Sequence, residues 1–143
     1  MIPASTLATY EAANRQLSKV FERLRADTPG KPLEDLKRWS EVLSGWLPTI
    51  GELASECGAQ ARQAKVAAES RRASIYAGGL VKDLPQREAE AIAKADESVL
   101  DGLKDWAEMK GWADKLYTLR DDCVESLNGV KKSIEAEKIM RGV

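Results

Sequence analysis

A single apolar stripe through the last third of the chain sets the strongest limit on the fold. No proline follows Pro85, and apolar residues recur at every third or fourth position, which is the spacing of one face of an α-helix. We therefore predict one long helix over residues 85–141, with Asn128–Gly129 as the expected place for a kink. The stripe comprises Val99, Leu103, Trp106, Met109, Ala113, Leu116, Leu119, Cys123, Leu127, Val130 and Ile134. An apolar seam of this length needs a partner helix beside it.

Three shorter helices are predicted upstream, over residues 4–26, 33–47 and 49–77. The segment Thr28–Pro32 is rich in proline and glycine and predicts a break. Pro48 is expected to end the second helix, and the capping-box pattern Thr49–Glu52 to begin the third. Gly78 and Gly79 are expected to end the third helix. Asp83 and Pro85 predict the next start, with a capping side chain and a proline in the first turn.

The composition agrees with a helical protein that self-associates. Of the 143 residues, 43% are hydrophobic but only 6% are aromatic, and 31% are charged. This mixture is typical of long helices that pack closely. We predict an all-α single domain over residues 1–143, as an elongated helical bundle or helical hairpin. Because the third helix is too short to cover the stripe, we also expect a homo-oligomer.

The chain has no sign of export or membrane insertion. Its first residues form no apolar signal segment, and no apolar run approaches the roughly 18 residues of a membrane span. Cys57 and Cys123 lie far apart without metal-ligand spacing, which favours reduced thiols. We expect a cytoplasmic protein, located in the host cytoplasm if a phage encodes it.

The absence of histidine removes most catalytic constellations. Serine–histidine triads, cysteine–histidine pairs and the common zinc sites all require that residue. Asp121, Asp122 and Glu125 cluster on one turn and could hold a divalent ion, but solvated helix charge is the favoured interpretation. We therefore expect a non-enzyme without a metal or other cofactor.

A basic stretch precedes the predicted break at Gly78–Gly79 and continues after it. Arginine matches phosphate oxygens with two donors, and Tyr76 follows the arginines as a candidate for base stacking. Glu69 lies nearby and cancels part of the charge. The other interpretation is a solvated helix face with local ion pairs. The candidate DNA-binding residues are Arg62, Lys65, Arg71, Arg72, Tyr76, Lys82 and Arg87.

Four tryptophans allow two interpretations as well. Trp39 and Trp46 are seven residues apart, and Trp106 and Trp112 are six apart. Aromatic rings beside basic grooves stack on single-stranded bases. Aromatic residues at helical spacing more often fill a core or a subunit contact, which is the favoured interpretation here.

The segments "AKVAAESRRASIY" and "AIAKADESVLDGLKDWAEMKGWADKLYTLRDDCVESLNGVKKSIEAEKIM" resemble the UvsY family of recombination mediators from T-even-like phages. The resemblance covers residues 49–140. It places Lys65–Ala67 on the start of the family's basic motif, Arg71 or Arg72 on its arginine, and Tyr76 on one of its tyrosines. The second basic position falls on Glu69 or Ser70, and the second tyrosine is absent.

This resemblance implies a small all-helical protein that forms ring-like oligomers. It implies binding to single-stranded DNA and the loading of a RecA-like recombinase onto strands coated by a single-strand-binding protein. The alternative is a small helical phage protein that binds another protein without DNA, as an anti-defence inhibitor or a virion adaptor. A coiled-coil scaffold with neither partner is the third interpretation.

Overall fold

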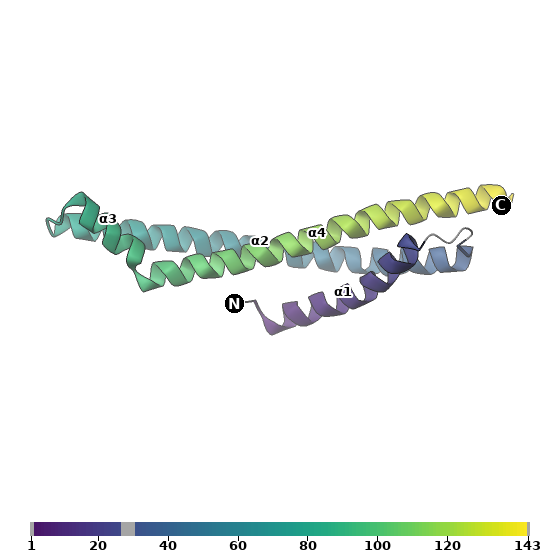
Figure 1. Ribbon diagram of the computed structural model, residues 1–143, viewed down its shortest axis with the longest axis horizontal. Helices are drawn as coiled ribbons and strands as arrows, with labels where there is room; N and C mark the ends of the chain where they lie inside the picture. The colour runs from purple at the N-terminus through teal and green to yellow at the C-terminus, as the bar shows by residue number, and fades with distance from the viewer. Residues whose placement is uncertain (1, 27–30, 143) are drawn as a thin grey trace. The chain divides into compact units, whose positions relative to one another are not determined.

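The computed structural model describes residues 2–26 and 31–142, and in this part of the chain it contains helices and no strand. The helices are α1 (Ala4–Arg25), α2 (Leu33–Val81), α3 (Gln86–Ala95) and α4 (Glu97–Met140) (Figure 1). The predicted all-α class and the long C-terminal helix are therefore confirmed. Residues 28–30 of the predicted break lie outside the described residues.

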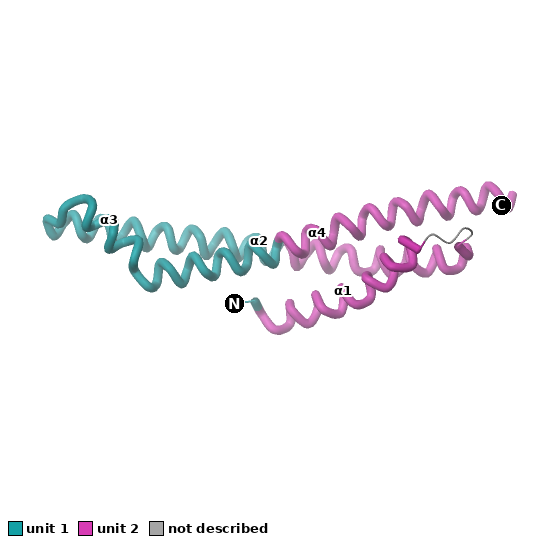
Figure 2. Tube along the Cα trace, in the orientation of Figure 1, with its two compact units in different colours: residues 1–2, 55–113 teal, residues 3–54, 114–143 magenta. Residues whose placement is uncertain are grey.

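The helices form two compact units (Figure 2). Unit 1 contains residues 1–2 and 55–113, and unit 2 contains residues 3–54 and 114–143. The long helices α2 and α4 each contribute one part to both units. The expectation of a single domain over the whole chain stays a prediction.

Unit 2 packs α1 against the first part of α2 and the last part of α4. Leucines and an isoleucine fill its core, because one apolar stripe of each helix faces inward. The α2–α4 pairing is antiparallel: the Cys123 thiol donates to the Leu43 carbonyl oxygen at 3.3 Å, while Gly51 lies closest to the Arg120 side chain. The buried residues are Thr6, Ala13, Leu17, Val20, Leu36, Leu43, Ile50, Ala54, Leu116, Leu119, Cys123, Leu127 and Val130.

Unit 1 packs the second part of α2 against α3 and the first part of α4. The α2–α4 pair is again antiparallel, since Ala68 meets Gly102 and Arg71 meets Ser98. Small side chains dominate its buried set, which is Cys57, Ala61, Ala68, Ala89, Ala93, Val99, Met109 and Ala113. Small residues allow helix backbones to approach closely, as at Gly102, where an added Cβ would lie 3.0 Å from the Ala68 Cβ.

The predicted stripe is confirmed along α4. Eight of its eleven residues are buried, and Leu103, Trp106 and Ile134 are partly buried. The helix runs through Asn128 and Gly129 without interruption. Both cysteines are free and buried, and burial raises the pKa of each thiol.

The predicted helix end at Pro48 is wrong, because α2 continues from Leu33 to Val81 with Pro48 inside it. Proline removes one N–H and frees the carbonyl of the residue four positions earlier, here Ser44. Both Ser44 and Pro48 are exposed, so water can bind that carbonyl. The buried Leu43 and Ile50 hold the helix on both sides of the proline. The Thr49–Glu52 capping box is therefore unused.

The prediction of one long helix over residues 85–141 is also wrong, because α3 ends at Ala95 and α4 begins at Glu97. Asp96 separates them in an extended conformation. Its carboxylate accepts hydrogen bonds from the backbone N–H groups of Ser98 and Val99, at 3.0 and 3.2 Å. Asp96 therefore caps α4, which is a strong start signal without proline or glycine.

Candidate functional site

The charges of the chain are unevenly distributed along the sequence. Residues 62–87 contain six basic and two acidic residues and carry a net charge of +4, whereas the rest of the chain carries −5. The basic stretch occupies the end of α2, the following turn and the start of α3. A nearly neutral protein thus contains one strongly basic segment within unit 1.

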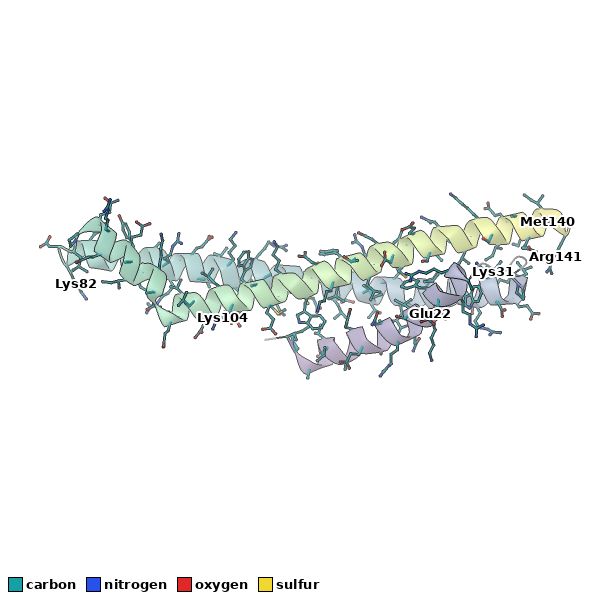
Figure 3. All side chains as sticks on the ribbon, viewed as in Figure 1. Glu22, Lys31, Lys82, Lys104, Met140 and Arg141 are labelled. Carbon is teal, nitrogen blue, oxygen red and sulfur yellow. The ribbon has the colours of Figure 1, made fainter. Side chains whose placement is uncertain are left out.

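A Schellman motif ends α2 and reverses the chain. The Leu84 N–H donates to the Gly79 carbonyl at 3.1 Å, and the Asp83 N–H donates to the Leu80 carbonyl at 3.1 Å. This motif requires a left-handed residue, which is Asp83 with φ 59°. Pro85 then occupies the N-cap position of α3. The sequence predicts it inside the first turn of the helix instead. Lys82 lies at this turn (Figure 3).

Gly79 allows α3 to pack directly on α2. A Cβ added at Gly79 would lie 2.9 Å from the Ala89 Cβ, whereas one added at Gly78 would meet nothing within 4 Å. The predicted role of this glycine pair as the helix end is therefore wrong, since α2 continues to Val81. The close contact, and not the break, requires glycine at position 79.

Farther along the same two helices lies an open groove of about 300 Å³. It brings together Arg72 and Tyr76 of the predicted set, together with residues the prediction did not assign to the site. Arg72 is exposed and Tyr76 is partly buried. The groove is lined by Glu69, Arg72, Ala73 and Tyr76 of α2 and by Gln86, Glu90 and Ala93 of α3. Its polar groups therefore include both hydrogen-bond donors and acceptors.

Arg71 points toward α4 and not into the groove. Its Nε donates to the Ser98 Oγ at 3.3 Å, and the Ser98 hydroxyl donates in turn to the Asp96 carboxylate. The Ser98 hydroxyl, the backbone N–H groups of Val99 and Ser98, and the Arg71 charge together lower the pKa of Asp96. Adjacent residues are about 100° apart around a helix, so Arg71 and Arg72 serve two different surfaces.

Lys65 lies over an aromatic ring of α4. Its Nζ is 5.0 Å from the centre of the Trp106 ring, and the Lys110 Nζ is 5.8 Å from the same centre. These are cation–π contacts. Trp106 therefore interacts with two lysines of unit 1, which favours its interpretation as a packing residue.

The other cations of the predicted set lie outside the groove and are exposed. Lys82 and Arg87 do not line the groove that contains Arg72. Within residues 2–26 and 31–142, no ion pair or hydrogen bond engages the side chains of Arg62, Arg72, Lys82 and Arg87.

The tryptophans of unit 2 take part in packing. Trp39 and Trp46 are both partly buried, and the Trp46 Nε1 donates to the Gln16 Oε1 at 2.9 Å. This hydrogen bond joins α2 to α1. Trp112, in unit 1, is also partly buried.

The acidic triplet of unit 2 lies on the surface of α4. Asp121, Asp122 and Glu125 are exposed, and an Asp121 carboxylate oxygen lies 3.3 Å from an Arg120 nitrogen. In the described part of the chain, no three histidine, cysteine or acidic side chains lie together as metal ligands. Asp122 and Glu125 instead border a groove of about 440 Å³ beside Phe21, Leu24 and Val130.

Sequence reasoning identified Arg72 and Tyr76 but assigned no role in the site to Gln86 or Glu90. The spacing along α3 could have indicated these residues. Gln86, Glu90 and Ala93 are four and three residues apart, so they lie on one face of a helix. The sequence predicts this segment only as the start of a longer helix, and that prediction assigns no separate face to α3.

The described residues include no helix long and apolar enough to cross a lipid bilayer. Comparisons with protein-family models, curated proteins and solved structures found no match to this chain.

Proposed function

We propose that this protein is a recombination mediator that binds single-stranded DNA and helps a RecA-like recombinase to load onto strands coated by a single-strand-binding protein. The observation that supports DNA binding is the +4 segment over residues 62–87. Four of its six cations have no side-chain partner in the described structure. The recombination role follows from the UvsY-like motif that the same residues carry.

Phosphate contacts supply the affinity in this proposal. Arg62, Lys82 and Arg87 are exposed along α2, the turn and α3, outside the groove, where a strand can bind without breaking internal ion pairs. Each neutralised phosphate releases condensed counterions, so the logarithm of the affinity falls with that of the salt concentration by about 0.7 per contact for single strands. Three contacts predict a slope of about −2.

Tyr76 supplies stacking. Its ring lies partly buried beside Arg72 in the groove between α2 and α3. Stacking of a base on an aromatic ring contributes about 1–3 kcal/mol and tolerates any sequence. Phosphate contacts on the exposed cations and one stacked base thus combine on a single unit.

Self-association multiplies these contacts along one strand. The core of unit 1 consists mostly of small side chains and leaves several large apolar side chains exposed. These are Val66, Leu80, Val81, Ile92 and Leu100. Exposed apolar side chains of this kind suit contacts between copies of the chain.

The test measures fluorescence anisotropy of a labelled single-stranded oligonucleotide at two salt concentrations. We expect salt-sensitive binding that falls by tenfold or more in the Lys82→Ala/Arg87→Ala variant, which removes two of the exposed cations that contact phosphate. The matched control is Lys131→Ala/Lys132→Ala, which removes an adjacent exposed basic pair from α4 in unit 2. Equal losses in the two variants, or no binding at low salt, would contradict the proposal.

A recombinase assay tests the mediator role separately. The protein is added to a RecA-like recombinase on DNA coated with single-strand-binding protein, and filament formation is followed. We expect faster formation with the wild-type protein than with Lys82→Ala/Arg87→Ala. DNA binding without faster filament formation would support the DNA site but contradict the mediator function.

A protein-binding role without DNA is the second candidate, and the exposed fraction of Val81, 84%, is the observation that favours it. An apolar side chain this exposed, next to exposed Leu80, marks a surface that suits a protein partner. Molar mass in solution, with and without the oligonucleotide, separates the candidates. A monomer whose molar mass does not change when the oligonucleotide is added favours the protein-binding role.

A further inference from the structure

The groove between α2 and α3 lacks the net positive charge that would favour a phosphate. Among its lining residues, Glu69 and Glu90 are acidic and Arg72 is the basic one. Lys94 lies outside this lining with its Nζ 3.2 Å from the Glu90 Oε1, so the groove and its rim are close to neutral. A phosphate would be repelled by the carboxylates at short range. The phosphates of a bound strand therefore belong on the exposed cations outside the groove.

The groove does suit a small, flat, polar group. Its volume of about 300 Å³ lies at the lower end of the range for small-ligand sites. Ala73 and Ala93 add little bulk to the two helical walls, and the Tyr76 ring provides an aromatic surface. Glu69 and Glu90 accept hydrogen bonds, Arg72 donates them, and the Gln86 amide does both.

We propose that this groove holds one base of the bound strand and prefers cytosine to thymine. The inference rests on the proposed DNA binding and adds a substrate preference to it. Cytosine carries an exocyclic amino group, which donates a hydrogen bond to a glutamate carboxylate. Next to the amino group, its ring nitrogen and carbonyl oxygen accept hydrogen bonds from Arg72 or Gln86. The base plane stacks on Tyr76.

Thymine lacks the group that the carboxylates need. In place of the amino group it presents a carbonyl oxygen, which a carboxylate repels. Its single ring N–H is flanked by two carbonyl oxygens. A strand of thymines would therefore bind through its phosphates and stacking alone, without donating an amino-group hydrogen bond to Glu69 or Glu90.

A basic side chain from a partner protein is the competing occupant, because two carboxylates and an aromatic ring also bind a cation. Arg72 weighs against it. The guanidinium lies in the same groove, repels a second cation and requires an acceptor. A base that both donates and accepts satisfies Arg72 and the carboxylates together.

The experiment compares labelled oligo(dC) and oligo(dT) of about 15 nucleotides, a length that spans one binding site. Affinities are measured by anisotropy at low salt with the full chain. We expect the wild-type protein to bind oligo(dC) about fivefold more tightly, in line with a single base-edge contact. The Glu69→Ala/Glu90→Ala variant is expected to bind the two strands equally.

The matched control is Glu88→Ala. Glu88 is an exposed acidic residue on α3 that does not line the groove. Its removal changes the charge of the same helix, so it alters both affinities alike and leaves their ratio near five. Circular dichroism and thermal melting confirm that each variant is folded.

The outcomes separate this inference from the proposed function. Equal binding of both strands by the wild-type protein, or a ratio that persists in Glu69→Ala/Glu90→Ala, overturns the base site and leaves DNA binding intact. Failure to bind either strand overturns both. Binding of a labelled oligoarginine peptide that is lost in the double variant, together with a ratio of one for the strands, assigns the groove to a protein partner and overturns the inference.

Discussion

The two units of this protein are built from the same two long helices but differ in their cores. Unit 2 adds α1 to them and buries large side chains, among them Leu17, Leu43 and Leu116 at 0% exposure. Unit 1 adds the short α3 and buries mostly alanines, such as Ala61, Ala68 and Ala89. Large buried side chains contribute more free energy than alanines because they remove more apolar area from water.

The difference in cores is matched by a difference in surfaces. Unit 1 carries the basic segment, the groove and five of the exposed large apolar side chains, whereas unit 2 exposes Val124, Ile139 and Met140 in the described residues. Met140 and Arg141 lie at the C-terminal end of α4 (Figure 3). The comparison indicates that unit 2 provides stability and that unit 1 provides contact surfaces. Binding regions are often drawn from the less stable parts of a fold.

The largest effect on stability is expected from Leu43→Ala in unit 2. Removal of a fully buried leucine leaves a cavity and costs about 2–5 kcal/mol in the free energy of unfolding. Urea denaturation measures this value. Ala61→Gly in unit 1 is the comparison and is expected to cost about 1 kcal/mol from helix propensity. A smaller loss for Leu43→Ala than for Ala61→Gly would reverse the assigned roles of the two units.

The glycine pair at the end of α2 gives the next effect. Gly79→Ala pushes a Cβ to 2.9 Å from the Ala89 Cβ, and overpacking of this kind costs about 1–3 kcal/mol, more than the gain in helix propensity. Gly78→Ala meets nothing within 4 Å and is expected to stabilise the helix by up to about 1 kcal/mol. Thermal melting of the two neighbours measures the contrast. Equal shifts would show that α3 does not pack closely on α2.

Asp83→Gly is expected to stabilise unit 1 by about 1 kcal/mol or less. Asp83 holds a left-handed conformation that glycine adopts without steric cost. Its carboxylate also lies at the negative end of the α2 dipole. Asp83→Asn removes the charge but keeps a side chain of the same size. Urea denaturation of both variants therefore separates the contribution of the left-handed conformation from that of the charge. A destabilised glycine variant would contradict the assigned turn geometry.

The smallest effect concerns the charge of Asp96 at the start of α4. Hydrogen bonds from Ser98 and the backbone, with the Arg71 charge, lower the pKa of Asp96 in the folded state. A lowered pKa contributes stability above the ordinary carboxyl pKa, and this contribution is lost as the pH falls through the lowered value. Asp96→Asn keeps a capping oxygen but has no charge. We expect the difference between wild type and variant to be present at pH 6 and to be lost as the pH falls through the lowered pKa of Asp96, as urea denaturation can check. A constant difference would exclude the charge as its cause.

Much of the helical pattern could be predicted from the sequence, because it depends on local periodicity. The apolar stripe of α4 and the inward faces of α1 and α2 follow from residue spacing alone. The basic segment and its exposure could also be predicted, since charged side chains remain at the surface unless they are paired. Arg72 and Tyr76 could therefore be proposed as candidates from the sequence, without their surroundings.

The tertiary structure alone decided where the helices end and what surrounds the arginines. Proline at position 48 is a local signal to stop, yet the packing of Leu43 and Ile50 keeps α2 intact through it. The groove needs α3 to approach Gly79, and Glu69, Arg72 and Glu90 meet only after that approach. Periodicity along one helix determines which face is apolar. The match between two helices determines how close they come, because contacts between residues far apart in sequence depend on both surfaces at once.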